Sequence, residues 1–231
     1  TANYTMFEKQ VDFFQQNFTV ITWDIPLHGL SRPYLDFSYC KTAMELKNIL
    51  DNEYIKKVIL VGMSMGGYPS QMFADLYPNM VEGFVALDTT PFGMEYYSKS
   101  DLWWLKKVAS MAQAFSNNML RKSMAKSVSL TKYSYNKMLE MLEPLTKQQI
   151  IEQMSIAYGE FAVENKDMNF SFPVLILLGE NDNTGKVKQY CQAWSSNAGY
   201  PLHIIKNAAH FSNGDNYEQV NSEIEMFINR L

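Results

Sequence analysis

Residues 56–70, KKVILVGMSMGGYPS, decide the fold of this chain. The stretch begins with a nearly continuous apolar run, 56–63, which is typical of a parallel strand covered by helices on both faces. Ser64 follows at once, between Gly62 and Gly66 in a G-x-S-x-G pattern, and a helix is expected to begin at the glycines. Gly62 and Gly66 would let strand and helix pack closely. Strand, serine and helix in this order predict a sharp turn that exposes the serine hydroxyl at the carboxyl edge of a sheet.

Strand-like and helical patterns alternate along most of the chain. Strands are predicted at 18–24, 56–63, 80–88, 171–180 and 201–207, and segments with apolar residues at helical spacing separate most of them. Such alternation predicts an α/β fold, a doubly wound and mostly parallel sheet with helices on both faces.

Residues 93–170 interrupt this alternation. The stretch contains no strand-like run, its pattern predicts about four helices, and it holds more than half of the 15 methionines of the chain. Methionine adapts to irregular spaces, so these side chains are expected first of all to form the core of the cap, with some of them also lining a pocket. The sequence therefore predicts a helical cap at 93–170, inserted into a core formed by 1–92 and 171–231.

Composition excludes several classes of protein. The 231 residues are 47% hydrophobic, enough for one globular core, and the net charge of −4 gives no basic surface for a nucleic acid. No apolar stretch reaches the ~18 residues that a membrane span needs, so no membrane partner is expected. Cys40 and Cys191 are predicted to be free thiols in a reducing compartment, which favours a cytoplasmic location. The chain has three histidines, so no multi-histidine metal site is expected.

Two further polar residues follow predicted strands. Asp182 ends the GEND stretch after the strand at 171–180, and His210 lies in NAAHFSN after the strand at 201–207. Because parallel strands end at one edge of the sheet, both are expected beside Ser64, at the edge where α/β sheets bind ligands. Asp88, after the strand at 80–88, is the alternative acid.

A helix that starts directly after the serine also points unpaired backbone N–H groups toward the same place. The backbone N–H of Met65 is therefore the predicted donor to an oxyanion. His28 lies in a turn rich in glycine and proline, where a role in shaping the loop is favoured over chemistry.

Four motifs in the same order resemble those of the α/β-hydrolase superfamily, in particular its capped, single-domain, esterase-like members. They are WDIPLHGLSRP at 23–33, GMSMGG at 62–67, LLGEND at 177–182 and the final histidine, His210. The resemblance extends over nearly the whole chain outside the cap. Along the chain the expected nucleophile, Ser64, comes first, the acid Asp182 second and the base His210 last, which is the order found in that family.

The resemblance implies a serine hydrolase that acts on a small, largely apolar ester, thioester or lactone through an acyl-enzyme. Ser64 would be the nucleophile, His210 the general base and Asp182 the residue that orients the imidazole. No metal or organic cofactor is implied. Two alternatives remain open at this point: a carbon–carbon bond hydrolase or lyase with the same triad, and a non-catalytic ligand receptor on a hydrolase scaffold.

The resemblance also implies a strand ending in HG before the first helix, with the second oxyanion donor just after it. The first residues, TANYTMFEKQ, are similar to those that follow this motif. N-terminal strands are therefore expected to be missing from the chain, with the second donor upstream of Thr1. The family's sheet would place such a strand between 18–24 and 56–63.

Overall fold

A parallel sheet of four strands forms the centre of the molecule. The computed structural model describes residues 1–231, except for the side chain of Lys106. The strands follow the order β1 (Val58–Met63), β2 (Val81–Leu87), β3 (Val174–Gly179) and β4 (Leu202–Ile205). All residues of β3 are buried, as expected of a strand that is covered on both faces. Four of the five predicted strands are thus confirmed, each with slightly narrower bounds.

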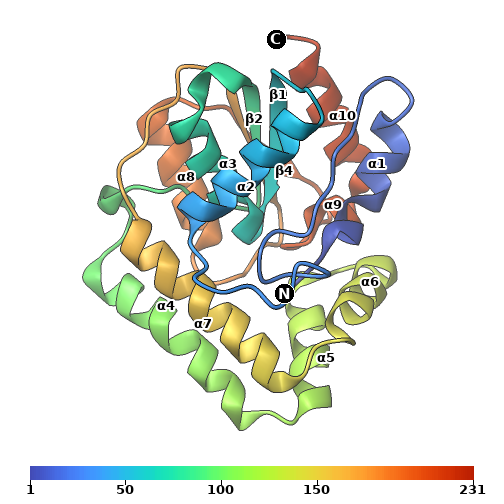
Figure 1. Cartoon of the computed structure of the whole chain (residues 1–231). Coiled ribbons are helices and arrows are strands. Elements are labelled where there is room, and N and C mark those ends of the chain that lie inside the picture. Colours follow the sequence, from blue (N-terminus) through green and yellow to red (C-terminus); the bar gives the residue numbers. More distant parts are fainter.

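Helices cover both faces of the sheet (Figure 1). One face carries α2 (Tyr39–Asn52), α3 (Gly67–Leu76) and α8 (Val187–Ala198), and the other carries α1 (Glu8–Phe14) and α10 (Tyr217–Ile228). The short helices η1 (Tyr4–Phe7) and α9 (Ser212–Asp215) precede α1 and α10. Apolar side chains at helical spacing on α10 explain why this helix packs on the sheet; they are Val220, Ile224 and Phe227, all buried against β2 and β3.

The predicted strand at 18–24 is wrong. The structure assigns no strand to these residues, and among the described strands β1 pairs with β2 alone. The β-rich composition of FTVITWD misled the prediction, because a strand exists only where a neighbouring backbone accepts and donates its hydrogen bonds. The segment 18–24 does not pair with β1, and both line one cavity instead.

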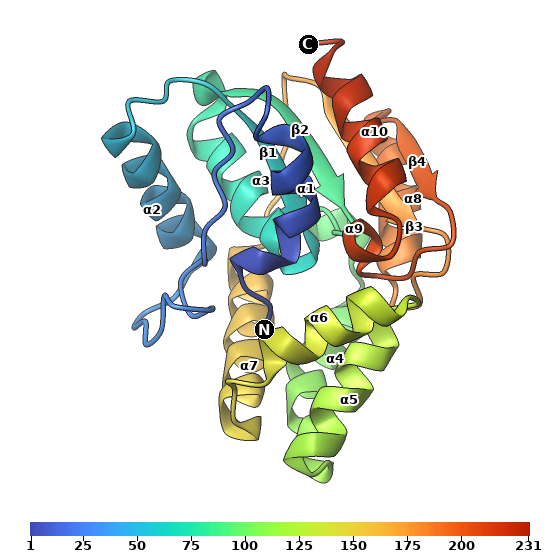
Figure 2. The same ribbon diagram turned by 90° about the vertical axis from the view of Figure 1, so that its right-hand side faces the viewer.

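Four α-helices lie between β2 and β3, at one end of the sheet in both views (Figures 1 and 2). They are α4 (Lys99–Met111), α5 (Asn117–Val128), α6 (Lys132–Leu142) and α7 (Lys147–Glu164). Each begins after a serine or threonine whose hydroxyl accepts a backbone N–H of the first turn; these N-caps are Ser98, Ser116, Thr131 and Thr146. We refer to α4–α7 as the helical insertion. Its separation from the core as a domain of its own stays a prediction.

A carboxylate at the end of the helical insertion joins it to the core. Glu164, the last residue of α7, accepts the backbone N–H groups of Tyr39 (2.5 Å) and Cys40 (3.1 Å) at the start of α2. The Tyr39 hydroxyl donates in turn to the Ala157 carbonyl on α7 (3.0 Å). A negative charge at a helix N-terminus is stabilising, so these bonds hold α2 and α7 together. None of the described helices is long and apolar enough to cross a membrane.

Glu164→Ala is expected to lower the free energy of unfolding by about 1–3 kcal/mol, because two N–H groups lose a charged acceptor. Glu164→Gln keeps one acceptor oxygen and should lower the free energy of unfolding by less. The free energy of both variants is measured by urea unfolding. Glu152→Ala removes the same charge from an exposed position of α7 and is the matched control. Equal midpoints for Glu164→Ala and Glu152→Ala would contradict the anchoring role of Glu164.

Candidate active site

Ser64 lies on a sharp turn between β1 and α3. Its φ of +50° belongs to the left-handed region, which a residue with a side chain adopts only where its surroundings impose it. A Cβ on Gly62 would lie 2.7 Å from the Cα of Gly67, and a Cβ on Gly67 would lie 2.2 Å from the Thr89 hydroxyl oxygen. A Cβ on Gly66 would meet nothing within 4 Å. The close-packed pair is therefore Gly62 and Gly67, which corrects the prediction for Gly66.

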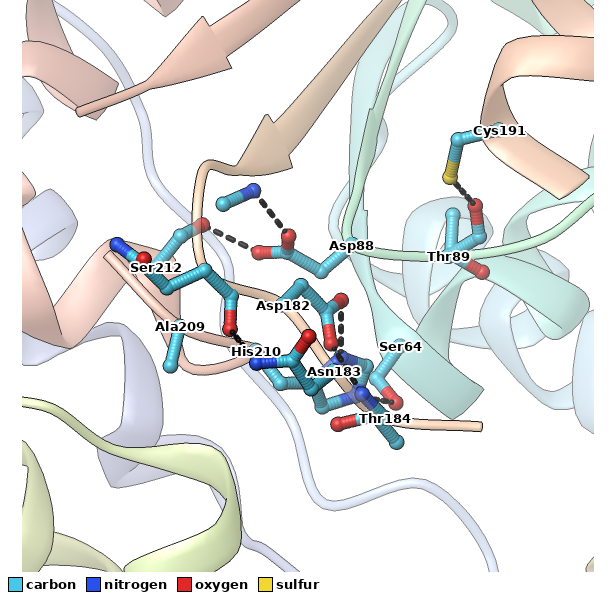
Figure 3. A network of polar contacts seen from close by, with 12 residues as sticks. Ser64, Asp88, Thr89, Asp182, Asn183, Thr184, Cys191, Ala209, His210 and Ser212 are labelled. Atoms are coloured by element: carbon cyan, nitrogen blue, oxygen red, sulfur yellow. Dashed lines mark hydrogen bonds and ion pairs between the residues drawn. The ribbon is translucent and has the colours of Figure 1, made fainter. Parts of the chain in front are cut away.

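The structure brings Ser64, His210 and Asp182 together in one chain of hydrogen bonds (Figure 3). The Ser64 hydroxyl oxygen lies 2.7 Å from Nε2 of His210, and Nδ1 of His210 lies 2.8 Å from Oδ2 of Asp182. A carboxylate accepts hydrogen bonds, so Nδ1 carries the proton of the neutral imidazole and Nε2 accepts the Ser64 hydroxyl. This arrangement can remove a proton from the serine.

The loops that carry Asp182 and His210 lie against each other. The backbone N–H of Asn181 donates to the carbonyl of Ala208 (2.8 Å), and a Cβ on Gly179 would lie 2.2 Å from the carbonyl oxygen of Ala209. Oδ1 of Asp182 accepts the backbone N–H of Thr184 (2.8 Å), which leaves Oδ2 for His210. The carboxylate is thus fixed before any ligand binds.

Burial and charge act in opposite directions on His210. His210 is only 6% exposed, and this burial lowers the pKa of its imidazole. The hydrogen bond and charge of Asp182, together with the charge of Asp88, raise the pKa by more, so the net pKa lies above the ordinary 6.5. The imidazolium form, which a general base must pass through, is therefore stabilised by two carboxylates.

Asp88, the alternative acid, accepts hydrogen bonds from other groups than the imidazole of His210. It is fully buried at the end of β2, with a φ of +45°. Its Oδ1 accepts the backbone N–H of Gly179 (2.7 Å) and its Oδ2 accepts the Ser212 hydroxyl, so it links the loop before Asp182 to the loop after His210 (Figure 3). Burial raises the pKa of Asp88 to about 7, although the positive charge of His210 and both hydrogen bonds oppose this.

The histidine loop is also attached to the helical insertion. The Asp215 carboxylate accepts the backbone N–H groups of Ala209 (2.9 Å), Leu130 (2.9 Å) and Thr131 (2.8 Å), and the last two connect α5 to α6. Phe211 packs among the apolar side chains of the helical insertion. Sequence reasoning missed Asp215 and the bridging contacts of Asp88, because neither belongs to a local motif and their partners are distant in sequence.

Ser64, Met65 and His210 line a cavity of about 1270 Å³. Its walls are mostly apolar, and the residues that line it include members of β1, α2, α7, the first fourteen residues and the segment 18–25. Met65 belongs to the first helical turn after Ser64, where backbone N–H groups have no acceptor within the helix. The described side chains contain no group of three or more His, Cys, Asp and Glu that could hold a metal ion.

The predicted free thiols are both present. Cys40 is half-buried, and Cys191 is buried with its thiol donating to the Thr89 carbonyl (3.0 Å). Burial raises the pKa of Cys191 well above its ordinary value, so this sulfur stays protonated and does not act as a nucleophile.

Comparisons with known proteins show which hydrolases the chain is similar to. A serine hydrolase-like protein of Danio rerio is 26% identical over 173 residues, which cover 74% of this chain and 51% of the relative. A putative esterase/lipase of Haemophilus influenzae is 27% identical over 90 residues, 39% of this chain and 31% of the relative. The chain thus spans about half the length, or less, of these curated relatives.

Among solved structures, a thermophilic esterase from Thermogutta terrifontis matches with a TM-score of 0.81 at 19% identity, covering 99% of this chain and 86% of the esterase. At this identity the match shows the fold alone. The model of the alpha/beta hydrolase fold family matches residues 1–217. The chain therefore belongs to the alpha/beta hydrolase fold family.

Proposed function

We propose that the protein is a serine hydrolase that cleaves a small, largely apolar ester, thioester or lactone through an acyl-enzyme. The observation that carries the proposal is the unbroken chain from the Ser64 hydroxyl through His210 to Asp182, with distances of 2.7 and 2.8 Å. The names of the relatives, a serine hydrolase-like protein and a putative esterase/lipase, support it. A cytoplasmic location stays a prediction.

The reaction uses groups that are already in place. The Ser64 oxygen attacks the substrate carbonyl while its proton moves to Nε2 of His210. Asp182 holds the proton on Nδ1 and stabilises the imidazolium that forms. His210 then returns the proton to the leaving group, and an acyl-enzyme remains on Ser64. His210 then removes a proton from a water molecule, whose oxygen attacks the acyl carbonyl. The bond to Ser64 breaks, His210 returns the proton to the Ser64 oxygen, and the acid is released.

The backbone N–H of Met65 is the donor that we assign to the oxyanion of each tetrahedral intermediate. It belongs to the residue directly after the nucleophile, on the turn that leads into α3. Donors of this kind act in a site with little water, where one of them contributes about 10²–10³-fold in turnover. The apolar walls of the cavity favour a substrate whose acyl group is mostly hydrocarbon.

Hydrolysis of p-nitrophenyl esters of graded chain length tests the proposal. We expect turnover that falls by roughly 10⁴-fold or more in Ser64→Ala, because the nucleophile is lost while binding is kept. Ser155→Ala, at an exposed position of α7, is the matched control and should keep full activity. If the folded protein hydrolyses no ester, the carbon–carbon lyase and receptor alternatives replace the proposal.

Asp88 provides a second prediction, because its charge and its hydrogen bonds can be removed separately. Asp88→Asn keeps both bonds, with the amide oxygen accepting from Gly179 and the amide N–H donating to Ser212. It removes the negative charge that raises the pKa of His210. The pKa of His210 should therefore fall. Since catalysis needs neutral His210, the acidic limb of the pH profile of kcat/KM should move to lower pH, while kcat at pH 8 stays nearly unchanged.

Asp88→Gly removes the bonds as well as the charge. Glycine tolerates the φ of +45° at this position, so the backbone is not strained. We expect the same shift of the acidic limb together with a fall in kcat at pH 8 of roughly 10-fold or more, because the two loops lose their common partner. Both pH profiles are measured on one p-nitrophenyl ester. Equal kcat values for the Asn and Gly variants would contradict a positioning role of Asp88.

A further inference from the structure

Two polar side chains that the triad does not use also line the cavity of Ser64. His28 belongs to the loop after the segment 18–25, and Gln153 belongs to α7 of the helical insertion. Each is only 4% exposed. Each also has one polar atom that is held by the protein and one buried polar atom without a partner, Nε2 of His28 and Oε1 of Gln153.

The free nitrogen of His28 is a hydrogen-bond acceptor. Nδ1 lies 3.1 Å from the carbonyl oxygen of Pro26, and a carbonyl only accepts, so Nδ1 carries the proton. Burial lowers the pKa of this imidazole well below its ordinary value, which keeps the ring neutral. Nε2 therefore presents a lone pair. The contact with Pro26 is the loop-shaping role that the sequence favoured, and it leaves Nε2 for another partner.

The free oxygen of Gln153 is an acceptor as well. Its amide N–H donates to the carbonyl of Leu27 (2.7 Å), and this bond fixes which end of the amide is the oxygen. Leu27 directly precedes His28 in the chain. The amide of Gln153 is thus attached to the same loop as the imidazole, and the two acceptors belong to one part of the cavity wall.

A buried acceptor without a partner costs about 1–3 kcal/mol, so such atoms call for a donor. Neither side chain is charged, and a cation taken from water into this mostly apolar cavity would lose its hydration without gaining a counter-charge. The nearby carboxylate of Asp24 already accepts the backbone N–H groups of Tyr4 and Leu30, at 2.7 Å each. The matching ligand group is therefore a neutral donor, a hydroxyl or an amide N–H.

We propose that His28 and Gln153 bind a hydroxyl or amide N–H on the part of the substrate remote from the scissile carbonyl. The inference rests on the proposed function and narrows it: the preferred substrate is an ester, thioester or lactone with a hydrogen-bond donor on its acyl group. A plain alkyl ester fits the apolar walls but leaves both acceptors unpaired. The two residues set specificity, and the triad performs the chemistry.

Paired substrates test this assignment. The probes are p-nitrophenyl ω-acetamidoalkanoates with spacers of increasing length, each paired with the ketone in which CH₂ replaces the amide N–H. A second series pairs ω-hydroxyalkanoate esters with methyl-terminated ones. At the best spacer we expect kcat/KM to favour the donor-bearing member by roughly 10-fold or more, because only that member satisfies the buried acceptors.

The ratio of kcat/KM within a pair is then measured in His28→Phe and in Gln153→Met, which remove one acceptor each on two different elements. Each variant should bring the ratio close to one. Gln148→Met makes the same change at an exposed position of α7 and should keep the wild-type ratio. Because the readout is a ratio, a general loss of activity in one variant does not imitate the expected result.

The outcomes separate the two proposals. If alkyl esters are hydrolysed and no spacer gives a preference for the donor, the acceptors hold water and this inference is overturned while the proposed function stands. A preference that survives in both variants also overturns it, because another group then binds the donor. If no ester of either series is hydrolysed by the folded protein, the proposed function fails and this inference fails with it.

Discussion

The close packing of β1 against α3 is the constraint on which the site depends. Gly62 and Gly67 lie so near each other and Thr89 that neither position has room for a Cβ. This contact forces the chain to turn within one residue, and Ser64 takes up the turn with a φ of +50°. Its hydroxyl consequently leaves the sheet edge at a fixed angle and reaches His210. A larger residue at either glycine would move Ser64 and the helix that follows it.

Hydrogen bonds to three carboxylates fix the other half of the site. Asp182 orients the imidazole, Asp88 links the loops on either side of it, and Asp215 joins the histidine loop to the connection between α5 and α6. A carboxylate with two or more donors has little freedom, so the three residues position His210 without help from a ligand. The same bonds connect His210 with the helical insertion, whose helix α7 forms part of the cavity wall.

The sequence predicted those features that are local or periodic. Continuous apolar runs identified β1 to β4, and polar residues after three of these strands identified Ser64, Asp182 and His210, which the structure brings together. The segment 18–24 had an equally strand-like composition but has no strand partner, and pairing is a property of the whole sheet.

Features that depend on distant partners were beyond prediction. Nothing in ALDTTP shows that Asp88 accepts hydrogen bonds from Gly179 and Ser212, which lie 91 and 124 positions away. The pairing of Gln153 with the His28 loop depends in the same way on how α7 packs against the core. The G-x-S-x-G motif points to Gly66, whereas the contact of Gly67 with Thr89 becomes visible only in the folded chain.

The proposed reaction requires Ser64 to be an activated nucleophile. Reaction of the folded protein with diisopropyl fluorophosphate, followed by intact mass spectrometry and peptide mapping, tests this property. We predict one adduct per chain, located on Ser64, which forms more slowly as the pH falls and His210 becomes protonated. If the folded protein forms no adduct, or forms it on another residue, Ser64 is not the nucleophile.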